Sequence, residues 1–86
     1  MIAELYTSAF CGPCHATRAV LAEASRLVPA LEVRELDVVR HEERAVAESI
    51  RNTPTVILRD DAGAQVLRAE GVPTVPQVLQ AVAAAL

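Results

Sequence analysis

The chain has 86 residues, 52% of them hydrophobic and only 2% aromatic, so it can build one small core from valine, leucine and alanine. Its formal net charge of −3, with no lysine among eight basic residues, excludes the basic surface that nucleic-acid binding requires. No apolar run approaches the length of a membrane span, and no signal peptide is recognisable. We therefore expect a single cytoplasmic domain over residues 1–86, without nucleic-acid or membrane partners.

The first half of the chain predicts strand, helix, strand and helix. Residues 2–7 are rich in strand-forming side chains. Residues 11–28 then carry an apolar stripe at helical spacing, and Pro29 ends that helix. The stripe consists of Val20, Leu21, Ala24, Leu27 and Val28. Residues 31–38 alternate in part and predict a second strand. Residues 41–51 predict a short helix with acidic residues in its first turn and Arg51 at its end.

The second half predicts a β-hairpin and a final helix. The continuous apolar run of residues 55–58 is typical of a strand buried on both faces. A turn at residues 60–63 joins it to a strand over residues 65–68, so these two strands should pair antiparallel. After Gly71, Thr74 and Gln77 have the spacing of a capping box. The inward stripe of this helix consists of Val75, Val78, Leu79, Val82 and Leu86.

The predicted order is β-α-β-α-β-β-α, which is an α/β fold. The first two strands are joined by a helix and should be parallel, with a right-handed crossover. The last two strands should be antiparallel. Together they predict a four-stranded mixed sheet flanked by three helices.

The only two cysteines form the motif Cys11-Gly12-Pro13-Cys14, whose spacing places both sulfurs on one helical turn. Such a pair serves reversible two-electron chemistry or metal binding. Cys11 would begin the helix, where unpaired N–H groups favour the thiolate, so we predict it to be the nucleophile. Cys14, one turn further, would resolve the mixed disulfide. Gly12 would allow a partner backbone to approach, and Pro13 presets a helical φ.

Phe10 and the CGPC motif follow a strand and open a helix, and Thr53-Pro54 precedes an apolar strand about forty residues later. This combination resembles the thioredoxin family in its minimal form, over nearly the whole chain. The resemblance implies a thioredoxin-like fold and a monomeric protein-disulfide reductase. Its partners would be disulfide-containing proteins and an upstream reductase or glutathione. It implies no bound cofactor and no metal.

The resemblance also implies a substrate-binding patch around the cysteines. Pro54 would be the family's cis-proline, and Thr53 would offer its backbone to an extended substrate segment. Phe10 replaces the family's usual tryptophan before the first cysteine and would be a contact surface. Gly71 and Val72 match the loop that forms a third edge of this patch.

Two departures from the family pattern concern proton transfer. Thioredoxins usually carry a buried aspartate six residues before the first cysteine, paired with a lysine. This chain has Leu5 there and no lysine. Glu4 is adjacent but should point to the opposite face of the strand. Deprotonation of Cys14 would then rely on water or on the departing thiolate, and we expect slower resolution. His15 follows Cys14, where it either is solvated or, as imidazolium, favours a thiolate.

Three other functions remain open from the sequence. Cys11-x-x-Cys14-His15 satisfies the pattern for c-type haem attachment, although the only methionine is Met1. A zinc or iron–sulfur site would need further ligands, and a dimer bridging two such pairs could supply them. A glutaredoxin-like, glutathione-dependent reductase would fit the chain length but lacks its Gly-Gly-Asp segment at residues 71–73. A redox-sensitive binding module without turnover is the last alternative.

Overall fold

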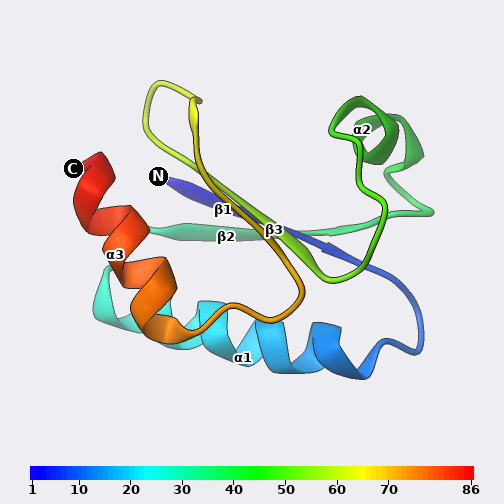
Figure 1. The fold of residues 1–86 in the computed structure, drawn as a ribbon, viewed down its shortest axis with the longest axis horizontal. Coiled ribbons are helices and arrows are strands. Elements are labelled where there is room, and N and C mark those ends of the chain that lie inside the picture. Colours follow the sequence, from blue (N-terminus) through cyan, green and yellow to red (C-terminus); the bar gives the residue numbers. More distant parts are fainter.

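The computed structural model describes all residues, 1–86, as a four-stranded sheet with helices on both faces (Figure 1). The two longer helices, α1 and α3, lie on one face, and the short helix α2 lies on the other (Figure 1). The predicted element order is confirmed. The elements are β1 (Ile2–Thr7), α1 (Gly12–Leu27), β2 (Glu32–Asp37), α2 (Glu42–Ala47), β3 (Thr55–Arg59), β4 (Gln65–Glu70) and α3 (Val75–Ala85).

The strand order in the sheet is β2-β1-β3-β4, with β1 and β3 in the centre. β1 pairs parallel with β2, as a helical crossover requires, and places Leu5 beside Glu35. β1 also pairs antiparallel with β3, and β3 pairs antiparallel with β4. The predicted mixed sheet and its hairpin are therefore confirmed. Residues 55–58 are all buried, as the continuous apolar run predicts.

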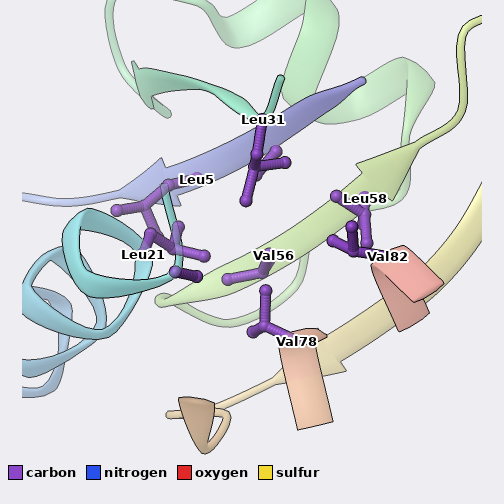
Figure 2. Packing of buried hydrophobic residues seen from close by; sticks show 9 residues of the cluster. Leu5, Leu21, Leu31, Val56, Leu58, Val78 and Val82 are labelled. Atoms are coloured by element: carbon purple, nitrogen blue, oxygen red, sulfur yellow. The ribbon is translucent and has the colours of Figure 1, made fainter. Parts of the chain in front are cut away.

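The apolar core lies between the sheet and the α1–α3 layer. Leu5 and Val56 point from the central strands toward Leu21 of α1 and Val78 of α3 (Figure 2). Each fully buried side chain of this size contributes about 1.5–3 kcal/mol through removal of apolar surface from water. The cluster has nine buried members: Ala3, Leu5, Leu21, Ala24, Leu31, Val56, Leu58, Val78 and Val82.

The opposite face of the sheet is organised around a buried carboxylate. Glu4 alternates with Leu5 along β1 and therefore points toward α2. Its carboxylate accepts hydrogen bonds from Arg44 Nη2 at 2.6 Å and Arg59 Nε at 3.1 Å. Arg59 Nη2 also reaches Glu48 Oε1 at 2.7 Å. Arginine–glutamate pairs thus connect α2 to the sheet, next to the buried Ala45 of α2.

Three expectations about helix ends are wrong. Leu27 is 48% exposed and Leu86 is 86% exposed, so neither belongs to the core. At roughly 100° per residue, Leu27 lies about 120° around the helix from Leu21. Leu86 follows the last helical residue, Ala85. The second helix is also shorter than expected, because the chain turns away at Ser49 with φ +55° and leaves Arg51 outside the helix.

The start of α3 confirms the predicted capping box. The backbone N–H of Gln77 donates to Thr74 Oγ1 at 3.2 Å, and the N–H of Thr74 donates to Gln77 Oε1 at 2.9 Å. These bonds satisfy donors that a helix start otherwise leaves unpaired. Among the helices, none has both the length and the apolar content needed to cross a bilayer.

Candidate active site

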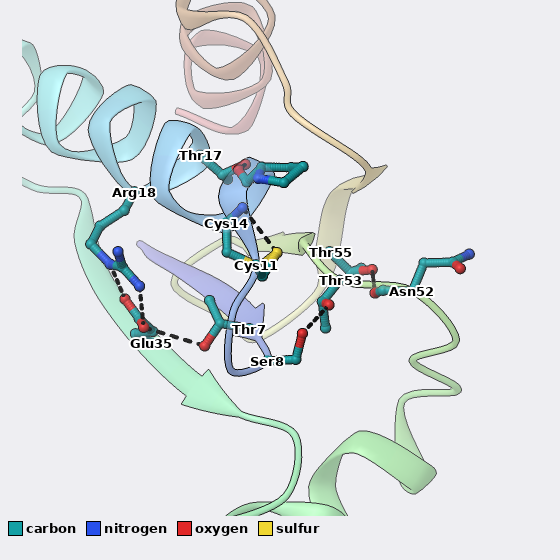
Figure 3. Close-up of a disulfide and its surroundings, with 11 residues drawn as sticks. Thr7, Ser8, Cys11, Cys14, Thr17, Arg18, Glu35, Asn52, Thr53 and Thr55 are labelled. Atoms are coloured by element: carbon teal, nitrogen blue, oxygen red, sulfur yellow. Dashed lines mark hydrogen bonds and ion pairs between the residues drawn. A yellow bond between two sulfur atoms is a disulfide. The ribbon is translucent and has the colours of Figure 1, made fainter.

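Cys11 and Cys14 form a disulfide at the N-terminus of α1, with their Cα atoms 5.2 Å apart (Figure 3). Cys11 is the N-cap residue, and its Sγ accepts a hydrogen bond from the N–H of Cys14 at 3.1 Å. Cys11 is partly exposed, whereas Cys14 is only 2% exposed. The predicted position of the pair, with the outer sulfur at the helix start and the inner one covered, is therefore confirmed.

The first turn of α1 presents the disulfide to solvent. Gly12 and Pro13 are both exposed, and nothing lies within 4 Å of the place where a Cβ on Gly12 would be. The buried hydroxyl of Thr17 donates to the carbonyl of Pro13 at 2.9 Å and holds this turn against the next one. His15 is exposed, in agreement with a solvated helix residue.

A second segment lies beside the disulfide. The Thr53–Pro54 peptide bond is cis, and Pro54 is buried. The hydroxyls of Thr53 and Ser8 lie 2.6 Å apart, which joins this segment to the loop that leads into Cys11 (Figure 3). The N–H of Gly71 donates to the carbonyl of Pro54 at 2.9 Å. The fold thus brings together three separate regions of the sequence, each of which was predicted to contribute to the site.

Two exposed apolar side chains lie in the loops of this region. Phe10, directly before Cys11, is fully exposed and has a left-handed φ of +58°. Val72 follows Gly71, whose φ of +97° suits glycine, and is 46% exposed. Neither side chain contributes to the core, which agrees with the expected contact surface at Phe10.

β1 places no ionisable group on the sheet face that α1 covers. Leu5 is fully buried and belongs to the apolar core. Glu4 points to the other face, where Arg44 and Arg59 bind its carboxylate. The expectation that Glu4 faces away from the cysteines is confirmed, so it does not replace the missing aspartate. Elsewhere, no three His, Cys, Asp or Glu side chains form a group that could hold a metal ion.

One polar group near the disulfide was not predicted from the sequence. Arg18 donates to both carboxylate oxygens of Glu35, at 2.7 and 2.8 Å, and Thr7 Oγ1 donates to the same carboxylate at 3.2 Å (Figure 3). The guanidinium of Arg18 lowers the pKa of Glu35, so the carboxylate is held ionised. The parallel pairing of β1 with β2 and the crossing of α1 bring these three residues together. Sequence spacing carries no signal for that contact.

The family model for thioredoxin matches residues 1–84 of the sequence. The chain belongs to the thioredoxin family. It is a thioredoxin-family protein with a redox-active disulfide between Cys11 and Cys14. No curated protein sequence matches the chain.

Solved thioredoxins share the fold at low sequence identity. Thioredoxin-2 of the malaria parasite is 14% identical, with a TM-score of 0.87 over 96% of this chain and 81% of its own. Thioredoxin 1 from Thermosipho africanus is 17% identical, with a TM-score of 0.83 over 98% and 92%. Fasciola hepatica thioredoxin is 24% identical, with a TM-score of 0.82 over 99% and 80%. The thioredoxin fold of this chain is therefore established by structural comparison.

Proposed function

We propose that this protein reduces disulfide bonds in other proteins, with Cys11 as the nucleophile and Cys14 as the resolving cysteine. The observation that carries the proposal is the asymmetry of the pair. Cys11 is accessible and caps the helix start, whereas Cys14 is buried one turn inside. Unpaired N–H groups at a helix start stabilise a thiolate, which is the attacking form of a cysteine.

The reaction transfers two electrons in two exchange steps. The Cys11 thiolate attacks one sulfur of the substrate disulfide, an S–S bond forms between them, and the other substrate sulfur leaves as a thiolate. The Cys14 thiolate then attacks Cys11 Sγ and expels the second substrate sulfur. The products are a substrate dithiol and the Cys11–Cys14 disulfide. An upstream reductase or glutathione then supplies two electrons to restore the dithiol, and no bound cofactor takes part.

Substrate would bind across the surface formed by three loops, which contain Phe10, Thr53 and Val72. The backbone N–H and C=O of Thr53 make no backbone hydrogen bond, so both can pair with an extended substrate segment. Phe10 and Val72 offer exposed apolar contacts on this surface. Gly12, which carries no side chain, leaves room for the substrate backbone. The neighbouring Pro54 and Gly71 fix the loop geometry.

The buried leucine at position 5 affects the rate of the second step, because it leaves Cys14 without the family's usual proton acceptor. Cys14 must lose its proton before it attacks, and no carboxylate of β1 lies on its face to accept that proton. Glu35 of β2 lies near the disulfide, but Arg18 and Thr7 bind its carboxylate oxygens, so we expect the acceptor to be water or the departing substrate thiolate. We expect the release step to be slower than in a thioredoxin that carries the aspartate. Stopped-flow measurement of both steps in the two proteins compares them directly.

The test uses reduction of insulin disulfides with a small dithiol as electron donor. Wild type should precipitate insulin chains, and Cys11→Ser should lose this activity completely. Cys14→Ser should accumulate a covalent mixed disulfide that a reducing gel dissolves. At neutral pH, iodoacetamide should alkylate reduced Cys11 faster than an ordinary free thiol.

Three results would contradict the proposal. One is insulin reduction that survives Cys11→Ser. Another is alkylation of Cys11 at an ordinary rate. The third is turnover supported only by glutathione and confined to glutathione mixed disulfides, which would instead assign a glutaredoxin-like function.

A further inference from the structure

A pair of side-chain hydroxyls connects the two loops that border the disulfide. Ser8 Oγ and Thr53 Oγ1 lie 2.6 Å apart, although the residues are 45 positions apart in the sequence (Figure 3). Ser8 lies between β1 and the helix start at Cys11, and Thr53 directly precedes Pro54. Both residues are partly buried, so water competes less for this hydrogen bond than at an open surface.

The residues around Thr53 are fixed by bonds of their own. Thr55 Oγ1 donates to the carbonyl of Asn52 at 2.6 Å, and the N–H of Gly71 donates to the carbonyl of Pro54 at 2.9 Å. Thr53 itself makes only one hydrogen bond in the structure, the one through its hydroxyl to Ser8. The contact with Ser8 is thus the only polar restraint that acts directly on this residue.

We infer that Ser8 is a positioning residue, which holds the backbone of Thr53 at a fixed place relative to Cys11. The inference rests on the proposed function, in which Thr53 pairs with the substrate backbone. Pairing of this kind needs the N–H and the C=O to be held together in one orientation. The hydroxyl bond supplies that orientation from the same loop that carries the nucleophile. Substrates with an extended backbone therefore gain from it, and small disulfides without amide groups do not.

The inference makes substrate preference, rather than overall activity, the quantity to measure. Reduced protein is mixed with two probes in separate single-turnover reactions. One probe is a pair of short peptides joined by one disulfide, and the other is bis(2-hydroxyethyl) disulfide. Ser8→Ala should lower the ratio of the peptide rate constant to the small-disulfide rate constant by about fivefold, the effect of one lost hydrogen bond.

Three further variants separate positioning from a general effect on the fold. Ser8→Thr keeps the hydroxyl and should restore the wild-type ratio. The double variant Ser8→Ala with Thr53→Val should lose no more than the single variant, because both changes remove the same bond. Ser25→Ala is the matched control. It also deletes a serine hydroxyl bond, to the carbonyl of Leu31 at 2.9 Å, but at the other end of α1. It should leave the ratio at the wild-type value.

Each remaining outcome overturns the inference. Equal loss of both rate constants in Ser8→Ala would show that the bond acts on the cysteines or on stability. An unchanged ratio would show that the bond does not position Thr53 for substrate. A lower ratio in the double variant than in Ser8→Ala alone would show that the two hydroxyls do not act through one bond. A wild-type protein that reduces neither probe would overturn the proposed function itself, and this inference with it.

Discussion

On one face of the sheet, nine buried apolar residues fill the space beneath α1 and α3, whereas on the other face arginine–glutamate pairs attach α2. The alternation of β1 creates this difference within one strand, since Leu5 points to the first face and Glu4 to the second. Tyr6 and Ile57 are fully buried on the polar face, but the apolar cluster does not include them.

The two faces of the sheet place different requirements on their side chains. Apolar packing requires volume and burial, so several hydrophobic side chains could serve at each position. The polar face requires each donor to meet its own acceptor, because a buried charge without a partner is strongly destabilising. Arg68 extends this network by donating to the carbonyls of Glu48 and Ser49, at 2.8 and 2.9 Å. The segment from Ser49 to Pro54 leads directly into the candidate active site.

The largest expected effect comes from a cavity on the apolar face. Leu58→Ala removes a fully buried side chain from the core. The free energy of unfolding should fall by about 2–5 kcal/mol, as for other buried leucines. Urea unfolding followed by circular dichroism measures this change. A loss below about 1 kcal/mol would mean that the core relaxes around the cavity.

A smaller effect is expected when the central carboxylate of the polar face is neutralised. Glu4→Gln keeps the size of the side chain but removes the charge that Arg44 and Arg59 contact. Loss of charged hydrogen bonds should lower the free energy of unfolding by about 1.5–3 kcal/mol. Sodium chloride at 1 M should narrow the gap from wild type only slightly, because pairs with a buried partner are screened much less than exposed ones.

The matched control for this prediction is Glu32→Gln. Glu32 pairs only with Arg34, and both side chains are more than half exposed. Exposed pairs of this kind contribute little to stability. A loss in Glu32→Gln as large as that in Glu4→Gln would mean that burial of Glu4 adds nothing.

A local effect is expected from Arg68→Met, which removes the two hydrogen bonds to the end of α2. Amide hydrogen exchange should become about fivefold faster over residues 48–53, as expected for about 1 kcal/mol of local stabilisation. Exchange in the middle of α1 should stay unchanged, because the apolar face is intact. Faster exchange throughout the protein would mean that the polar face is not an independent unit.

The smallest effect is a pH dependence confined to the polar face. Burial raises the pKa of the Tyr6 phenol above its ordinary value of 10.0, although a hydrogen bond from Arg44 opposes the shift. The folded state therefore keeps this proton at a higher pH than the unfolded state. The stabilisation is complete below about pH 10 and is lost as pH rises through the pKa of the folded state.

Urea unfolding of the oxidised protein between pH 8.5 and 11 tests this prediction. The chain has one tyrosine and no lysine, and disulfide-bonded cysteines do not titrate, so Tyr6 is the main side chain that ionises in this range. Wild type should lose stability above about pH 10, and Tyr6→Phe should not. An equal slope in the two proteins would assign the effect to another group.

Local sequence patterns predicted most of the fold because they act over a few residues. The capping box at Thr74 and Gln77 and the apolar run into β3 needed no distant partner to be recognised. The same reasoning failed at Leu27, which lies on another side of α1 than Leu21, and at Leu86, which follows the last residue of α3. The pattern of hydrophobic residues in the sequence does not show where a helix ends or which of its sides packs against the sheet.

For the candidate site, the sequence by itself determined the chemistry. It placed two cysteines one helical turn apart, with the first at the helix start, and it determined that no carboxylate would precede them at position 5. Only the tertiary structure decided which groups surround them. The contact of Ser8 with Thr53, the bond from Gly71 to Pro54 and the arginines around Glu4 each join residues far apart in the sequence. Such contacts follow from strand pairing and helix crossing, which are set by burial of the whole core and not by any short segment.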